Sequence, residues 1–488
     1  MSAPNLRDKT VKGLGWSTID SVAAQGISFV VGIILARLLS PTEFGTIGIA
    51  MIFVALFNRI INCGFSSALI RKQDVKDVDY STTFVYNLIV SGLLYVVCFF
   101  CSPYIAIFFH NEALTSVVRW ISLSLIINAF SIVQYTRLVK GIDFKTQAKI
   151  SIIASLFSGV VGIAMAYSGW GVWSLVGQQL SRQFCNTVFL WFFNKWVPSL
   201  RFSKSSFREL FSYGSKLMLS GIIDTLFGEL TTIFVGKIYT PATLGQYSRA
   251  KQFGGIFSSN LSAVMGRVTY PVLSEIQNDK VLLIAKYRQI IRTLMLVTGI
   301  GLAFMASTAN SVILMLIGPK WMEAIPYLQL LAFVEVTIPL KNVNLNLLQI
   351  YGRSDYILIL SIIKRIIELC AICLGFISIN WMLIGFAIAG VIGFLLNACF
   401  TMKVSGYTVF NQMKDIFPSF VISVTVGLIM FSISFYVANI FLCFTLQVLI
   451  GLLLFVLISE HFKLEEYKFL KTLIREYCVN PLKNKLKK

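Results

Sequence analysis

Long apolar runs, separated by short polar stretches, recur along the chain from about residue 13 to residue 459. A run of about 20 apolar residues is long enough to cross a bilayer as an α-helix. The pattern predicts fourteen membrane spans, at residues 13–38, 44–69, 82–108, 115–136, 150–167, 171–193, 212–238, 244–270, 289–317, 322–349, 355–378, 381–402, 417–438 and 441–459. The first run carries Asp20 and Gln25 and has no small-residue cleavage site, so we interpret it as a retained helix. We therefore expect an all-α polytopic membrane protein.

One segment occurs twice, 200 residues apart. Residues 36–50 read ARLLSPTEFGTIGIA and residues 236–250 read GKIYTPATLGQYSRA, so Pro41 aligns with Pro241 and Gly45 with Gly245. Each copy joins two apolar runs, and six predicted spans separate the copies. Six crossings return a chain to its starting side, so the spacing predicts two parallel six-helix lobes related by an axis along the membrane normal.

Basic residues are concentrated in the loops on one side of the predicted membrane. If the N-terminus is cytoplasmic, the inner loops and tail hold 28 Lys and Arg residues, whereas the outer loops hold one, Lys320. The positive-inside rule then places both termini in the cytoplasm and supports an even number of spans. This topology accounts for the net charge of +20. Some attraction to anionic membrane lipids is expected, and nucleic acid is not expected as a partner.

The polarity of the loops suggests how the chain is divided. Residues 194–211 form the most polar internal connection, with Pro198 and four basic residues, just before the second half. Residues 417–459 contain no Asp, Glu, Lys or Arg, which is typical of helices that face lipid. We predict an N-terminal lobe at 1–193, a cytoplasmic linker at 194–211 and a C-terminal lobe at 212–402. An additional peripheral helix pair follows at 403–459, and a basic cytoplasmic tail at 460–488.

Several charged residues lie deep inside the predicted spans, where a charge is costly and tends to face protein or water. Arg182 lies near the middle of its span among Gln178, Gln179 and Asn186, which favours a wet cavity. The sequence as a whole predicts a polar cavity with a cationic bias, suited to an anionic substrate because guanidinium groups match phosphate oxygens. Its candidate substrate-binding residues are Arg182, Arg59, Arg249, Lys341, Lys364 and Arg365. Lys364 and Glu368 are four residues apart and could instead form a structural pair.

Acidic residues in the first helix of each half are candidates for ion coupling. Asp224 aligns with Ala24, one helical turn after Asp20, so each half is expected to place a carboxylate on matching faces of its first helix. Glu229 adds another acid to the same span as Asp224. These acids could couple transport to protons or sodium, pair with Arg and Lys in the cavity, or form structural ion pairs between helices.

Other chemistries find little support in the sequence. The two CxxC matches lie inside apolar runs, where thiols usually serve packing. His110 and His461 lie at opposite ends of the predicted membrane, so no histidine metal site is predicted. The chain has no GxxxxGK[ST] motif for ATP. The short outer loops leave no room for a catalytic domain, so we expect neither an enzyme nor a resident cofactor.

Four short motifs, taken in order, give the chain a family resemblance. They are Gly13-Leu-Gly-Trp16, Leu39-Ser-Pro-Thr-Glu-Phe-Gly45, Leu244-Gly-Gln-Tyr-Ser-Arg-Ala250 and Tyr270-Pro-Val-Leu-Ser-Glu-Ile-Gln277. With the length and the span count, the chain resembles Wzx-type polysaccharide flippases of the WzxC-like branch, within the multidrug/oligosaccharidyl-lipid/polysaccharide exporter superfamily. The resemblance implies two six-helix lobes arranged as a V around a central cavity, plus two further helices.

The resemblance also implies a function. The chain would move an undecaprenyl-diphosphate-linked oligosaccharide across the bacterial inner membrane by alternating access, for capsule, exopolysaccharide or O-antigen synthesis. Its cationic cavity would receive the diphosphate, and Asp20, Asp224 and Glu229 would be the local candidates for proton or sodium coupling. We also expect polysaccharide polymerase and chain-length machinery as partners. The alternatives are a drug or metabolite antiporter of the same fold and, with less support, a membrane glycosyltransferase or polymerase.

Overall fold

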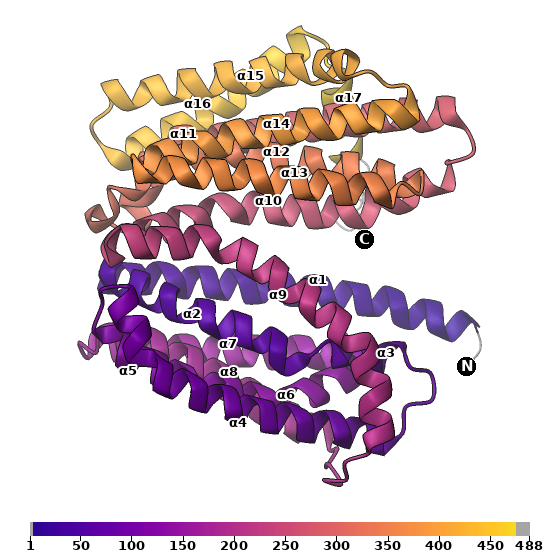
Figure 1. The fold of residues 1–488 in the computed structure, drawn as a ribbon. Helices are drawn as coiled ribbons and strands as arrows, with labels where there is room; N and C mark the ends of the chain where they lie inside the picture. The colour runs from indigo at the N-terminus through magenta and orange to yellow at the C-terminus, as the bar shows by residue number, and fades with distance from the viewer. Residues whose placement is uncertain (1–2, 475–488) are drawn as a thin grey trace, which may run out of the picture. The chain divides into compact units, whose positions relative to one another are not determined.

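The computed structural model describes residues 3–474, and this part of the chain is helical, with no strand (Figure 1). It divides into two compact units, Met1–Ser248 and Arg249–Lys488. The first unit holds α1 (Ala3–Leu38), α2 (Pro41–Asn62), α3 (Phe65–Arg71), α4 (Asp77–Phe108), α5 (Ala113–Ile121), α6 (Leu123–Lys140), α7 (Phe144–Tyr167), α8 (Val172–Asn194) and α9 (Lys204–Ile238).

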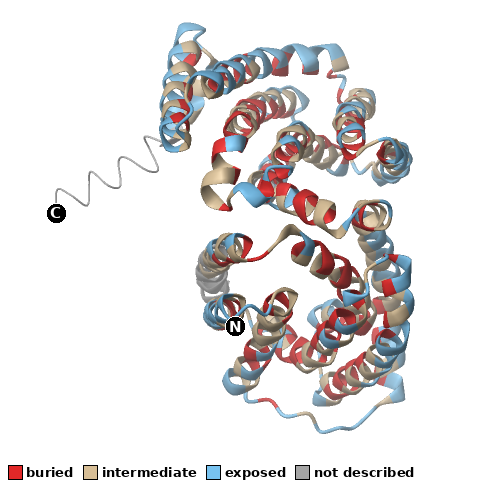
Figure 2. Cartoon of the chain, turned by 90° about the vertical axis from the view of Figure 1, so that its left-hand side faces the viewer, coloured by how far each residue is buried: buried red, intermediate tan, exposed pale blue. Residues whose placement is uncertain are grey.

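The next helix, α10 (Pro241–Glu275), begins in the first unit and continues into the second. The second unit continues with α11 (Lys280–Leu316), α12 (Ala324–Ile350), α13 (Ser354–Cys373), α14 (Ile379–Ser405), α15 (Val409–Tyr436), α16 (Ile440–His461) and α17 (Glu465–Ile474). In Figure 2 the residues of each unit are coloured by burial, and the buried positions lie mainly where its helices pack together.

Every predicted span coincides with helix, which confirms the all-α polytopic fold. Within the described residues, ten helices are long and apolar enough to cross a membrane. The predicted spans outside this set are α1, α8, α10 and α13; the side chains of α1 are described continuously only from Val22, and there the apolar stretch is Val22–Leu38. The count of fourteen therefore stays a prediction.

The two copies of the repeated hairpin pack directly against each other in the first unit. A Cβ atom on Gly45 would lie 1.8 Å from the Pro241 carbonyl oxygen, and one on Gly245 would lie 1.9 Å from the Pro41 carbonyl oxygen. Only glycine permits this reciprocal approach of two backbones. Pro41 also occupies the first turn of α2, where Ser40 and Glu43 form a capping box. In each hairpin the proline begins a helix, and the glycine four residues later allows the two hairpins to pack together.

A second glycine contact holds the other end of α9 against the break between α2 and α3. Gly64 adopts a positive φ of 65°, and a Cβ atom there would lie 2.6 Å from the Gly214 carbonyl oxygen. A Cβ atom on Gly214 would in turn lie 2.2 Å from the Cys63 carbonyl oxygen. The helix α9 is thus fixed to α2 near both of its ends, and it belongs to the first compact unit.

The predicted linker is shorter than expected and is bonded to the first unit. Its non-helical part is residues 195–203, because α9 already begins at Lys204. The Trp196 indole donates to Asp77 at 2.9 Å, and the Ser203 amide donates to Thr82 at 3.0 Å. The connection is therefore held by hydrogen bonds to the first turns of α4. The domain boundaries inferred from the sequence stay a prediction.

In the second unit, α11 packs against α12, α15 and α16. Asp415, on α15, accepts hydrogen bonds from Arg288 at 2.6 and 2.9 Å, and from Arg292 and Tyr407. Arg292 also reaches Glu465 of α17, at 3.5 Å. The described part of the tail therefore continues as a short helix against α11, and residues 475–488 of the predicted tail lie outside the described residues.

Candidate functional site

Helices outside the set of ten clear membrane spans carry much of the candidate site. Asp20 lies on α1, Arg182 on α8, Arg249 on α10, and Lys364 and Arg365 on α13. Within the described residues, these four helices are outside the set of ten long, apolar helices that carry few charges. Polar positions in such a helix need protein or water around them. The cavities next to these helices are therefore the places to look for function.

One cavity of about 450 Å³ lies along the seam between α2 and α9. It is lined by Arg59, Asp224 and Glu229, together with Ala55, Thr225 and Gly228. The Arg59 Nε donates to the Thr225 hydroxyl at 3.2 Å, and the Thr225 hydroxyl donates to the Gly221 carbonyl at 2.7 Å. Arg59 and Asp224 are exposed on helices that are otherwise apolar enough for lipid. Charge at such positions indicates a surface that faces water.

A second cavity of about 280 Å³ lies among α1, α6, α7 and α8. Asp20 and Arg182 both line it, but they do not form a direct ion pair in the described part of the chain. The Arg182 guanidinium donates to the Ser28 hydroxyl at 3.5 Å. The other polar residues lining the cavity are Tyr135, Gln147, Ser151, Gln179, Gln183 and Asn186.

Two atoms at this cavity are buried without a hydrogen-bond partner. They are Oδ1 of Asp20, an acceptor, and Nε2 of Gln147, a donor. A buried polar atom without a partner is destabilising, and a bound water or ligand commonly satisfies it. The cavity therefore offers both signs of charge and unused hydrogen-bonding capacity, which suits a polar ligand or solvent.

A chain of amide side chains runs from this cavity to α2. Gln183 donates to Asn128 at 3.0 Å, and Asn128 donates to Asn58 at 2.7 Å. Asn58 is the residue before Arg59, which lines the first cavity. Neither Asn58 nor Asn128 is among the residues predicted for the site. The available signal was an asparagine inside an apolar span, where an amide needs a polar partner on another helix.

Asp20 and Asp224 meet different surroundings, and that they occupy matching helix faces stays a prediction. The two carboxylates line different cavities: Asp20 lies with α6, α7 and α8, and Asp224 lies with α2. The helix α1 packs on α7, whereas α9 packs on α2, so the first helices of the two halves have different neighbours. Equivalent positions in a repeat share a register, but packing decides what each side chain meets.

The basic candidates of the second unit fall into two places. Arg249 lies over the Trp321 ring, 6.0 Å from its centroid, and hydrogen-bonds Gln252. Lys341 and Lys364 come from α12 and α13 and meet at α14, where Lys364 Nζ donates to the Asn397 side-chain oxygen at 3.3 Å. In these contacts Arg249 and the two lysines have different partners.

Lys364 and Glu368, whose spacing allows a pair, do not form a salt bridge. Glu368 instead forms a 3.0 Å salt bridge with Arg365, three residues away. Spacings of three and four residues both place side chains on one helix face. The sequence could not choose between the two bases, and Lys364 turns toward Asn397 on α14 instead.

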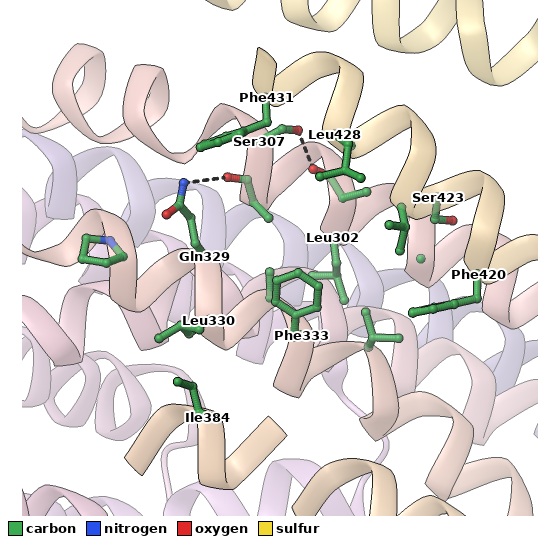
Figure 3. Close-up of a pocket in the computed structure, with 18 of the residues that line it drawn as sticks. Leu302, Ser307, Gln329, Leu330, Phe333, Ile384, Phe420, Ser423, Leu428 and Phe431 are labelled. Carbon is green, nitrogen blue, oxygen red and sulfur yellow. Dashed lines mark hydrogen bonds between the residues drawn. The ribbon is translucent and has the colours of Figure 1, made fainter. Parts of the chain in front are cut away.

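A large apolar cavity of about 560 Å³ also lies in the second unit, among α11, α12, α14 and α15 (Figure 3). Leu302, Phe333 and Phe420 line it. Two of its polar side chains bond to nearby backbone: Gln329 donates to the Ala306 carbonyl at 3.4 Å and Ser307 to the Ala303 carbonyl at 2.5 Å. This cavity is suited to hydrocarbon and holds none of the candidate charges.

Comparisons with known proteins agree with this picture. Residues 34–326 match the family model described as "Polysaccharide biosynthesis protein". The chain is 23% identical to the lipopolysaccharide biosynthesis protein WzxC of Escherichia coli over 374 residues, covering 76% of each protein. It is 26% identical to the succinoglycan biosynthesis transport protein ExoT of Rhizobium meliloti over 382 residues, covering 77% of this chain and 76% of ExoT.

The fold has a solved counterpart. A structure titled as the lipid II flippase MurJ in an inward closed conformation superposes with a TM-score of 0.70 at 16% identity. The match covers 91% of this chain and 98% of that one. At this identity the likeness shows the fold alone. Because the family model spans more than half of the residues, the chain belongs to the polysaccharide biosynthesis protein family.

Proposed function

We propose that the chain is a transporter, and not an enzyme, that moves an undecaprenyl-diphosphate-linked oligosaccharide across the bacterial inner membrane by alternating access. The observation that carries this proposal is the placement of charge. Arg59, Asp224 and Arg182 belong to membrane helices, yet they line cavities. A charge at the centre of a bilayer costs about 2.5–3.5 kcal/mol on insertion scales. Cavities that collect such charges are suited to water and to a polar cargo.

The relatives support the same class of cargo. ExoT is named as a transport protein of succinoglycan biosynthesis, and WzxC as a protein of lipopolysaccharide biosynthesis. The protein of similar fold is titled as a flippase for lipid II. A cargo with a lipid part and a polar part also matches a protein that has both charged and apolar cavities.

Anionic groups of the cargo would meet the basic residues of both units. In the first unit these are Arg59 and Arg182, whose planar guanidinium groups can hold two oxygens of a phosphate or carboxylate at once. In the second unit they are Arg249, Lys341, Lys364 and Arg365. The coupling ion, a proton or sodium, would be taken up at Asp20, Asp224 or Glu229.

The test of this function is complementation. A strain that lacks its own flippase for a surface polysaccharide would receive this gene together with glycosyltransferase genes that build a defined lipid-linked oligosaccharide. We expect surface polysaccharide to return and lipid-linked intermediates to stop accumulating. If the polysaccharide stays absent while resistance to toxic cations rises, the chain is a drug antiporter.

The proposed location is the inner membrane, with both termini in the cytoplasm and with membrane lipids, a polymerase and chain-length machinery as neighbours. The charge asymmetry of the loops supports this orientation. Single cysteines at Gly169 and Asn439, two predicted outer positions, should react with an impermeant reagent added to intact spheroplasts. Reaction only after the membrane is opened would invert the topology.

A further inference from the structure

Two lysines of the second unit converge inside the membrane helices. Lys341 extends from α12 and Lys364 from α13, and both stems pass the same point of α14, at Gly393. A Cβ atom on Gly393 would lie 3.4 Å from Cδ of Lys364 and 3.5 Å from Cδ of Lys341. The ammonium groups lie two bonds beyond these atoms. Gly393 therefore makes the room in which two like charges approach each other.

Asn397, one turn after Gly393, fixes this arrangement. It is completely buried, its Nδ2 donates to the Lys341 carbonyl at 3.1 Å, and its oxygen accepts from Lys364 Nζ at 3.3 Å. One amide thus ties the backbone of α12 to the side chain of α13. The Lys364 ammonium is therefore positioned by a buried polar group and is not merely reaching for the membrane surface.

The acids nearby are bonded to other groups. Glu368 forms its salt bridge with Arg365, and Glu335 accepts a hydrogen bond from Ser258. In the described part of the chain, neither lysine forms a salt bridge within 4.0 Å. Two ammonium groups held near each other repel, and an anion placed between them relieves that repulsion.

We propose that Lys341 and Lys364 form a binding site for a phosphate group, with Asn397 as the residue that positions Lys364. A phosphate group carries up to two negative charges, and lysine binds phosphate as a point charge that tolerates varied geometry. This site deepens the proposed function, because it assigns the phosphate end of the cargo to α12–α14. It rests on that function for the identity of the cargo, but not for the binding itself.

Binding can be tested without transport. The full chain would be purified into phosphatidylcholine nanodiscs and titrated with inorganic pyrophosphate at fixed ionic strength, with thermal unfolding as the readout. We expect saturable stabilisation in the wild type. Lys341→Ala and Lys364→Ala should each weaken binding by about tenfold or more, which corresponds to about 1.4 kcal/mol. Lys403→Ala is the matched control, because that ammonium lies against the Phe400 ring, 4.9 Å from its centroid.

A second variant keeps both charges. Gly393→Val fills the point at which the two stems meet, so it should also weaken pyrophosphate binding while leaving the net charge unchanged. Wild-type affinity in all three site variants overturns the proposal. So does an equal loss in Lys403→Ala, because it would mean that pyrophosphate responds only to overall charge.

Further arms identify the source of the phosphate. Competition by undecaprenyl diphosphate, lost in the Lys341 and Lys364 variants, assigns the site to the cargo. Competition by phosphatidylglycerol in the nanodisc, with the same dependence on the lysines, assigns it to a lipid headgroup. If complementation fails but the lysine-dependent binding persists, the proposed function falls and the phosphate site stands.

Discussion

The two units treat charge inside their membrane helices in opposite ways. In the first unit every candidate acid shares a cavity with an arginine: Asp20 with Arg182, and Asp224 and Glu229 with Arg59. In the second unit Lys341 and Lys364 converge while the nearby acids bond elsewhere. The first arrangement places acidic and basic side chains in the same cavity. An acid or an arginine there can exchange one partner for another without being left as an uncompensated charge. The second leaves positive charge for an anion from outside the protein.

The largest effect is expected from a substitution at the contact between the two hairpins, which should destabilise the first unit and leave the packing of the second unchanged. Gly45→Ala would place a methyl group on the Pro241 carbonyl, and overpacking of this kind typically costs about 1–3 kcal/mol. We expect a lower unfolding temperature in detergent and a loss of surface polysaccharide. Gly92→Ala, on α4 with nothing within 4 Å, is the control and should be neutral or stabilising. Equal stability of the two variants would contradict the contact.

Removing one member of a balanced pair comes next. Arg182→Ala leaves the Asp20 carboxylate without the arginine that shares its cavity. Loss of a partner costs about 3–5 kcal/mol in a fully buried direct ion pair, and these two groups form no direct pair. Arg182 is only half-buried, so we expect a smaller loss of stability but at least a tenfold loss of transport, on the order of 1.4 kcal/mol. Arg182→Lys should retain part of the activity. The measurement is surface polysaccharide at matched expression, and full activity of Arg182→Ala would remove this residue from the site.

Neutralising the acids tests whether the two cavities act separately. Asp20→Asn and Asp224→Asn should each reduce the dependence of transport on an imposed proton or sodium gradient. Because the residues line different cavities, the double variant should combine the single effects additively in free energy. Transport into vesicles under each gradient gives the answer. Gradient dependence that is unchanged in the double variant would exclude both acids from coupling.

The smallest effect is expected from restoring balance in the second unit. Arg365→Ala releases Glu368, which lies one helical turn from Lys364 and can then pair with it. Such a helical pair is worth only about 0.2–0.5 kcal/mol, so pyrophosphate binding should weaken by about twofold. Arg365→Lys keeps a partner for Glu368 and should bind like the wild type. Tighter binding in Arg365→Ala would mean that Arg365 itself opposes the phosphate.

The sequence predicted where helices occur better than where they end. Hydropathy marks the apolar part of a helix, so the start of α9 was expected at residue 212, but the helix begins at Lys204. The preceding Ser203 accepts a hydrogen bond from the Ser206 amide and caps the helix in polar surroundings that hydropathy does not register. Capping residues would have been the better guide to this boundary.

The site was predictable residue by residue but not as an arrangement. A charge in an apolar run identified Arg59, Arg182 and Lys341 as unusual. Which of them share a cavity depends on how α2, α9, α12 and α14 pack, and that is not encoded in the spacing within one helix. The exchange of partners around Glu368 shows the limit, because two bases lie within reach on the same face.

Asp415 has a consequence for how this protein can be shortened. The single carboxylate of Asp415 accepts hydrogen bonds from Arg288, Arg292 and Tyr407. A helix that the sequence suggests is an addition to a twelve-helix body therefore binds two arginines of α11. A chain cut after residue 403 would leave both guanidinium groups without that carboxylate. A trimmed twelve-helix version would therefore need Arg288 and Arg292 redesigned at the same time, and the last helix pair is not a detachable module.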